Sequence, residues 1–181
     1  MKLLSLTRWV LDARPLAFCV RAAALLLAMS LLSITGPFDE LITEPLILLN
    51  AMLAHYALRA LGARTALSGR FIQSPSFSVE VIPECTGVFV FLMVLAVTLA
   101  YPASWRAKTR GVLGGAFLIF FLNQARLVSL FILGENYPQV FEEAHVFVWQ
   151  GIFITVVSFY WYAWARKAST RAAGANLQAP R

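Results

Sequence analysis

Residues 111–133, "GVLGGAFLIFFLNQARLVSLFIL", decide the fold class of this chain. They are long and apolar enough to cross about 30 Å of hydrocarbon as a helix, which takes about 20 residues. One cation, Arg126, interrupts them, and Asn123 precedes it by one helical turn on the same face. An ionisable group at that depth is costly unless it faces protein or a watery cavity. The stretch therefore predicts a membrane span with a functional polar face.

The rest of the chain belongs to the same class. It has 181 residues, of which 60% are hydrophobic and 13% are charged, and its mean hydropathy is +0.72. Residues 16–34 and 146–165 are also long enough to span, and residues 88–101 reach spanning length if their helix starts near Cys85. We therefore expect an all-α integral membrane protein with about four transmembrane helices.

The charged residues give the spans an orientation. Lys and Arg gather in residues 2–14, 102–110 and 166–181, whereas residues 134–145 carry three Glu and no Lys or Arg. The positive-inside rule places the basic segments, and with them both termini, in the cytoplasm, and the acidic loop outside. Because the basic residues are distributed by loop rather than gathered on one patch, the net charge of +6 does not indicate nucleic-acid binding.

Two segments lie between the first two predicted spans. Residues 37–61 repeat apolar side chains at helical spacing but mix them with Glu44, Asn50 and Arg59, which is typical of an interfacial helix. We place this helix along the outer surface, and a fifth crossing stays open as the alternative. Residues 70–83 alternate apolar and polar side chains around a Ser-Pro-Ser turn and predict a small external β-hairpin.

We expect a single domain, because the predicted spans take up most of the 181 residues. Residues 1–167 are expected to form a single membrane-embedded domain, and residues 168–181 a small, polar and basic cytoplasmic tail without assigned structure. Two cysteines, Cys19 and Cys85, are too few for a disulfide framework and are not spaced for a metal. The sequence therefore predicts neither a metal nor another cofactor.

Three reactive side chains meet on the outer face in this layout. Cys85, in "VIPECTGVFVFLMVLAV" (residues 81–97), opens one span from outside, and His145 opens the last span from the same side. Arg126 lies eight residues, about 12 Å of helical rise, before Gly134 at the outer end of its helix, and its long side chain reaches upward. Separate helices thus bring a thiol, an imidazole and a guanidinium to one membrane face.

This set of groups suits acyl transfer. A cysteine at a helix N-terminus is biased toward thiolate, which attacks a carbonyl. His145 would protonate the leaving amine, and Arg126 would hold the developing oxyanion. Each residue alone also has a structural interpretation, because Cys85 could simply be packed, His145 could cap the interface, and Arg126 could pair with a glutamate such as Glu84, Glu142 or Glu143. Cys19 and His55 rank below them as site residues because they lack suitable polar neighbours.

The motif order resembles that of the exosortase/archaeosortase family of membrane cysteine transpeptidases. "PECTG" opens one span, "NQAR" lies inside the next, and a histidine opens the last, so that the resemblance covers roughly residues 71–165. It implies an active site of Cys85, Arg126 and His145 with Asn123 in support. Many members carry about twice as many spans, and this chain is similar to the short, core-only type such as exosortase H.

The resemblance also implies a location and a substrate class. Such an enzyme works at the extracytoplasmic face of the prokaryotic cytoplasmic (inner) membrane. Its partners are the lipid bilayer, an unidentified acyl acceptor, and exported proteins whose C-terminal sorting signal joins a short motif, a hydrophobic helix and a basic tail. A peptidase that only hydrolyses, and a non-catalytic assembly or transport subunit, remain as alternatives.

Overall fold

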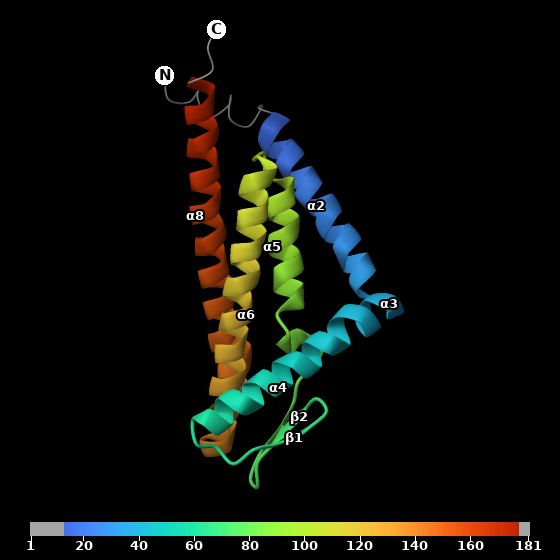
Figure 1. Ribbon diagram of the computed structural model, residues 1–181, viewed down its shortest axis with the longest axis vertical. Coiled ribbons are helices and arrows are strands. Elements are labelled where there is room, and N and C mark those ends of the chain that lie inside the picture. Colours follow the sequence, from blue (N-terminus) through green and yellow to red (C-terminus); the bar gives the residue numbers. More distant parts are fainter. Residues whose placement is uncertain (1–12, 178–181) are drawn as a thin grey trace.

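Helices make up most of the protein. The computed structural model describes the chain from residue 13 to residue 177. Figure 1 shows α2 (Ala13–Ser33), α5 (Val88–Ala100), α6 (Trp105–Asn136) and α8 (Trp149–Leu177) along the long axis of the molecule. Helix α2 packs on α5, and α5 and α8 both pack on α6. The predicted all-α membrane architecture is confirmed.

Within the described part of the chain, four helical stretches are long and apolar enough to cross a membrane. They are Pro15–Ser33, Gly36–Ala60, Trp105–Asn136 and Pro138–Thr170. A protein with several such helices is a multi-pass membrane protein. Helix α5 is shorter, since its 13 residues rise only about 20 Å.

The start of α5 differs from the sequence prediction. We expected one continuous helix from about Cys85, but a single 3₁₀ turn, Pro83–Cys85, comes first. Gly87 then adopts a left-handed backbone with φ of 76°, and the α-helix begins at Val88. A positive φ cannot continue a right-handed helix, so Gly87 separates the cysteine turn from α5.

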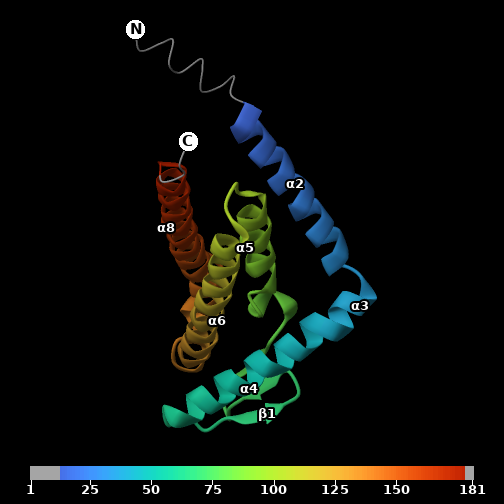
Figure 2. The same ribbon diagram turned by 45° about the horizontal axis from the view of Figure 1, so that its top comes forward.

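Helix α4 (Glu44–Ala60) follows α3 (Gly36–Phe38) and a π turn at Asp39–Thr43, and it lies across the bundle rather than along it. Figures 1 and 2 both show α4 passing across one end of α5 and α6. One face is fully buried and the opposite face is exposed. The buried residues of α4 are Ile47, Asn50, Ala51, Ala54, His55 and Leu58, and the exposed ones include Leu48, Met52 and Tyr56. The predicted amphipathic helix is therefore present, and its depth in the membrane stays a prediction.

A small antiparallel sheet covers the same end of the bundle. The predicted pair of strands is present as β2 (Phe71–Gln73) and β3 (Ser78–Glu80), with Ile72 opposite Val79. A third strand, β1 (Ala66–Ser68), pairs with β2, so that the expected hairpin is a three-stranded meander. Sequence reasoning missed β1 because three exposed residues carry no alternation of burial.

One buried cluster holds this end together. It joins the buried face of α4 to the sheet, to the cysteine turn and to α6 through Ile72, Val81, Cys85, Leu127 and Phe131. A second cluster joins α5, α6 and α8 deeper in the bundle through Val94, Ile119, Phe153 and Val157. The first cluster ties the cysteine turn to α4, the sheet and α6.

The last helix extends further than expected at its C-terminal end. Between α6 and α8 the acidic loop forms short turns at Pro138–Val140, Phe141–Glu143 and Ala144–Val148. Helix α8 then continues to Leu177, so residues 168–177, for which the sequence predicts no regular structure, are helical. Lys2, Arg8 and residues 178–181 of the predicted tail lie outside the described residues, whereas Arg14 lies in the first turn of α2.

Candidate active site

The cysteine turn is built by Pro83 and Gly87. Pro83 starts the 3₁₀ turn, and the backbone N–H of Cys85 donates to the carbonyl oxygen of Ile82 at 2.8 Å. The Cys85 side chain is 7% exposed and packs in the cluster of α4, the sheet and α6. Because α5 begins only at Val88, Cys85 lies in the 3₁₀ turn before the helix and not at the helix N-terminus that the sequence predicted.

Asn123 holds the cysteine turn against α6. Its side-chain amide is fully buried and donates to the carbonyl oxygen of Cys85 at 2.6 Å and to Oδ1 of Asn50 at 3.0 Å. Gln124 also donates to Oδ1 of Asn50, at 2.6 Å. Asn123 thus belongs to a hydrogen-bond network that holds the cysteine turn against α4 and α6.

Sequence reasoning missed Asn50 and Gln124 as parts of this network. Asn50 is 1% exposed and lies on the buried face of α4, one turn after Leu46, to whose carbonyl oxygen its amide donates. A polar residue in the buried phase of an amphipathic helix is a signal that the sequence contained. Its partners on α6 were not predictable, because they lie 73 and 74 residues away along the chain.

Arg126 lies one turn after Asn123 on α6 and lines a cavity of about 340 Å³. Glu84 from the cysteine turn, Gly87 from the start of α5 and Gln150 from α8 line the same cavity. The guanidinium carbon lies 5.8 Å from the centre of the Phe153 ring, within the range of a cation–π contact. The buried Nε of Arg126 has no hydrogen-bond partner in the part of the chain that the structure describes.

Arg126 is therefore not the ion-pair partner that one interpretation of the sequence suggested. Among the described residues, the ion pairs join Arg70 to Glu44 at 2.5 Å and Arg70 to Glu80 at 3.9 Å. Arg70 thus ties the sheet to α4. Arg126 instead keeps an unpaired donor at a cavity, which is the arrangement expected of a group that meets a ligand.

His145 lies in the π turn Ala144–Val148 that leads into α8. Its ring stacks on Phe141 at 5.8 Å and is half-buried. His145 is not among the residues that line the cavity at Arg126.

Asn123 links two of the other predicted residues, because it is hydrogen-bonded to the carbonyl oxygen of Cys85 and lies one helical turn before Arg126 on α6. Neither Cys85 nor His145 is among the residues that line the cavity at Arg126. The Cys85 thiol makes no hydrogen bond to Arg126 or His145 among the residues described. Catalytic hydrogen bonds often tighten only when substrate is bound, so this arrangement is compatible with a resting site.

The lower-ranked residues lie elsewhere. Cys19 is exposed on α2. His55 is buried on α4, and its Nδ1 is hydrogen-bonded to the Thr65 hydroxyl at 2.9 Å, which gives it a structural role.

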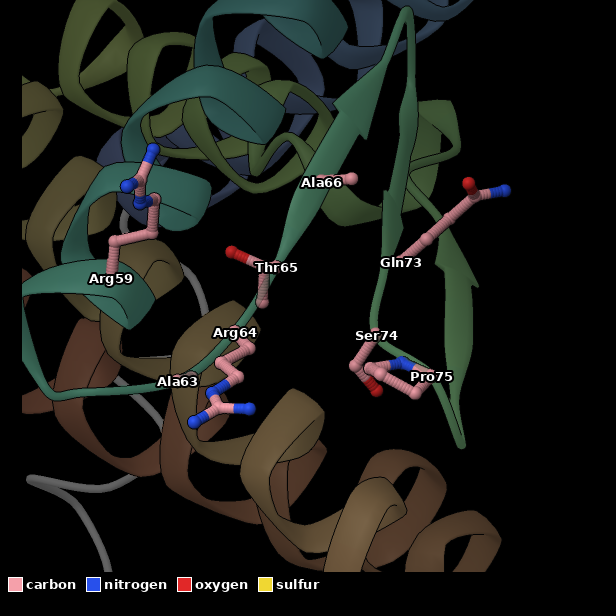
Figure 3. Close-up of a pocket in the computed structure, with 8 residues that line it drawn as sticks. All are labelled: Arg59, Ala63, Arg64, Thr65, Ala66, Gln73, Ser74 and Pro75. Carbon is pink, nitrogen blue, oxygen red and sulfur yellow. The ribbon is translucent and has the colours of Figure 1, made fainter.

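A second cavity lies beside the sheet. Its volume is about 650 Å³, and Figure 3 shows Arg59 and Arg64 on one side of it and Gln73, Ser74 and Pro75 on the other. Ala63, Thr65 and Ala66 complete its lining. None of the predicted site residues lines this cavity, so the candidate site is the one that holds Arg126.

The fold and the site together define a multi-pass helical membrane protein with a buried thiol, a histidine and an intramembrane arginine toward one end of its bundle. The family model "Transmembrane exosortase (Exosortase_EpsH)" matches residues 2–169. The chain therefore belongs to the transmembrane exosortase family.

A curated relative agrees with this family. The chain is 31% identical over 91 residues to the "Probable archaeosortase E" of Methanocaldococcus jannaschii, a match that covers 50% of this chain and 49% of the relative. The chain thus matches about half the length of that protein. No solved structure matches the chain.

Proposed function

We propose that this protein is a membrane cysteine transpeptidase that cleaves the C-terminal sorting signals of exported proteins. The observation that carries the proposal is Arg126, a cation without a counter-ion among the described residues. It lines one cavity with Glu84, the residue before Cys85, and with Gly87, two residues after Cys85. A fixed cation at a partly closed cavity stabilises an oxyanion better than the same cation in water.

The reaction begins once the proton of the Cys85 thiol has passed to His145, and the Cys85 thiolate then attacks the carbonyl carbon of the scissile peptide bond. The new C–S bond moves an electron pair onto the carbonyl oxygen, which the Arg126 guanidinium stabilises. The tetrahedral intermediate collapses, the C–N bond breaks, and His145 gives a proton to the leaving amine. The product is a thioester on Cys85 and a released hydrophobic helix with its basic tail.

A nucleophile from outside the protein completes the cycle. An amine or hydroxyl acceptor attacks the thioester, His145 takes the acceptor's proton, and the Cys85 thiolate leaves. Water in place of the acceptor would make the protein a simple peptidase. Mass spectrometry of the substrate's new C-terminus separates these outcomes, since transfer leaves a covalent adduct and hydrolysis leaves a free carboxylate.

We place the protein in a prokaryotic cytoplasmic membrane with the site on the extracytoplasmic face. One end of the bundle holds the start of α2, the connection between α5 and α6, and the end of α8 (Figure 1). The sheet and α4 lie at the other end. The first end carries the basic residues Arg106, Lys108 and Arg110, and the acidic loop before α8 lies at the second. This distribution follows the positive-inside rule, with both termini in the cytoplasm.

The direct test removes the thiol. An exported reporter ending in a sorting signal from the host genome is co-expressed with the wild type, with Cys85→Ala and with Cys85→Ser, and processing is followed by the loss of its C-terminal segment. We expect the unprocessed reporter to accumulate with both variants. Cys19→Ala is the matched control and should process normally, because Cys19 is exposed on α2. Normal processing by Cys85→Ala would overturn the enzyme proposal and favour an assembly or transport role.

A further inference from the structure

The cavity at Arg126 is a groove between α5 and α8. Its walls come from one face of each helix, at Phe89, Val90 and Met93 on α5 and at Gln150, Phe153, Ile154, Val157 and Ser158 on α8. The α8 positions follow the spacing of a single helical stripe. From Gln150 to Ser158 this stripe rises about 12 Å, or two helical turns.

The groove has an apolar floor and an exposed rim. Phe153 and Val157 form the floor, and each is only 6% exposed. Met93 on α5 is 47% exposed and Ile154 on α8 is 61% exposed, so that they stand at the opening. A volume of about 340 Å³ takes a few side chains rather than a whole helix. An occupant would therefore lie against the groove and insert side chains into it.

The polar groups of the groove are concentrated at its site end. Glu84, Arg126 and Gln150 line that end, whereas Met93, Ile154 and Val157 line the part deeper along the helices, to which Ser158 adds a single hydroxyl. The buried Nε of Arg126 has no acceptor within the described chain. A ligand that matches this groove is apolar over about two helical turns and presents a hydrogen-bond acceptor at its outer end.

We propose that this groove between α5 and α8 binds the hydrophobic helix of the sorting signal, an inference that rests on the proposed function. The substrate helix packs along Met93, Ile154 and Val157, and the extended residues before it pass Arg126, where their backbone carbonyls need donors. Helices in lipid associate through close packing and polar contacts, and the groove offers both. A lipid acyl chain would fill only the apolar part and leave the donor of Arg126 unused.

Site-specific photocrosslinking tests this placement. A photoreactive phenylalanine analogue is introduced at Met93, at Ile154, or at Phe117 of α6, which is 68% exposed and outside the groove. The Cys85→Ala background retains the uncleaved reporter with its sorting signal. We expect crosslinks to the reporter's hydrophobic helix from positions 93 and 154 and none above background from position 117. Crosslinks from positions 93 and 154 to lipid alone, or equal crosslinking from all three positions, would overturn the proposal.

A second variant fills the groove. Ile154→Trp should lower reporter processing at least tenfold, while the alkylation rate of Cys85 by a small thiol reagent stays within twofold of wild type. Phe117→Trp is the matched control and should keep normal processing. If the wild type cleaves the reporter, but position 154 does not crosslink to it and Ile154→Trp does not slow its processing, the groove proposal is wrong and the proposed function stands. If position 154 crosslinks to the reporter but the wild-type protein never cleaves the reporter, the proposed function fails and the groove proposal stands.

Discussion

The side-chain amide of Asn123 donates a 2.6 Å hydrogen bond to the backbone carbonyl oxygen of Cys85. Asn123 is fully buried on α6, and Arg126 follows it by one helical turn. The same helix therefore fixes the turn that carries the thiol and the cation proposed to stabilise the oxyanion. Any movement of α6 shifts both groups together.

Replacing Asn123 by Ala should loosen the cysteine turn. The change removes the donor to the carbonyl oxygen of Cys85, and leaving a buried acceptor without a partner costs about 1–3 kcal/mol, whereas Oδ1 of Asn50 still accepts from Gln124. We expect a lower unfolding temperature in detergent and a changed rate of Cys85 alkylation. Ser129→Ala on the exposed side of α6 is the control, since its hydroxyl bonds only to its own helix. Equal behaviour of the two variants would contradict a positioning role for Asn123.

Arg126→Gln should lower reporter processing by a factor of about 100 or more, the range seen when an oxyanion donor is removed. Arg126→Lys should recover only part of the activity, because lysine keeps the charge but loses the planar fork and its contact with the Phe153 ring. Arg59→Gln on α4 serves as a control for loss of an arginine away from this cavity. Full activity of Arg126→Gln would remove the observation that carries the proposed function.

Gly87→Ala should destabilise the protein. Gly87 has φ of 76°, and a Cβ there would lie 3.0 Å from Cγ2 of Ile119. A non-glycine residue in such a backbone conformation costs about 1–3 kcal/mol. Gly151→Ala, in the helical part of α8 with nothing within 4 Å of its Cβ position, should instead stabilise by about 0.5–1 kcal/mol. Thermal unfolding in detergent compares the two, and shifts of the same sign would refute the role of Gly87.

Tyr160→Phe should weaken the contact between α6 and α8. The Tyr160 hydroxyl donates to the carbonyl oxygen of Gly111 at 2.6 Å, and loss of one hydrogen bond costs about 0.5–1.5 kcal/mol. Tyr162→Phe is the matched control, because Tyr162 is 59% exposed on the same helix. Thermal unfolding should detect a lower midpoint only for Tyr160→Phe.

The orientation of the protein can be tested with two single cysteines. Ser76→Cys in the sheet turn and Thr109→Cys near the start of α6 are introduced after Cys19→Ala and Cys85→Ala remove the native thiols; both positions are exposed. A membrane-impermeant thiol reagent should label residue 76 in intact cells and residue 109 only after permeabilisation. The reverse pattern would place the site in the cytoplasm.

Much of the helical architecture could be predicted because it depends on local composition. A run such as residues 111–133 must be a helix in lipid, where every backbone group has to bond within its own segment. The amphipathic pattern of residues 37–61 likewise predicted α4, whose buried and exposed faces the structure confirms. The short strand Ala66–Ser68 and the break at Gly87 left no such periodic signal.

The sequence by itself determined the membrane class, the approximate spans, and the presence of a cysteine, an arginine and a histidine in an order that resembles the family's. Tertiary structure alone decided that Asn50, Asn123 and Gln124 lock the cysteine turn, that Arg126 keeps an unpaired Nε at a cavity, and that α5 and α8 form a groove beside it. The physical reason is the separation of the residues along the chain. A hydrophobic run determines the local structure of its own segment, whereas these hydrogen bonds join residues 38 to 74 positions apart and form only once the helices pack.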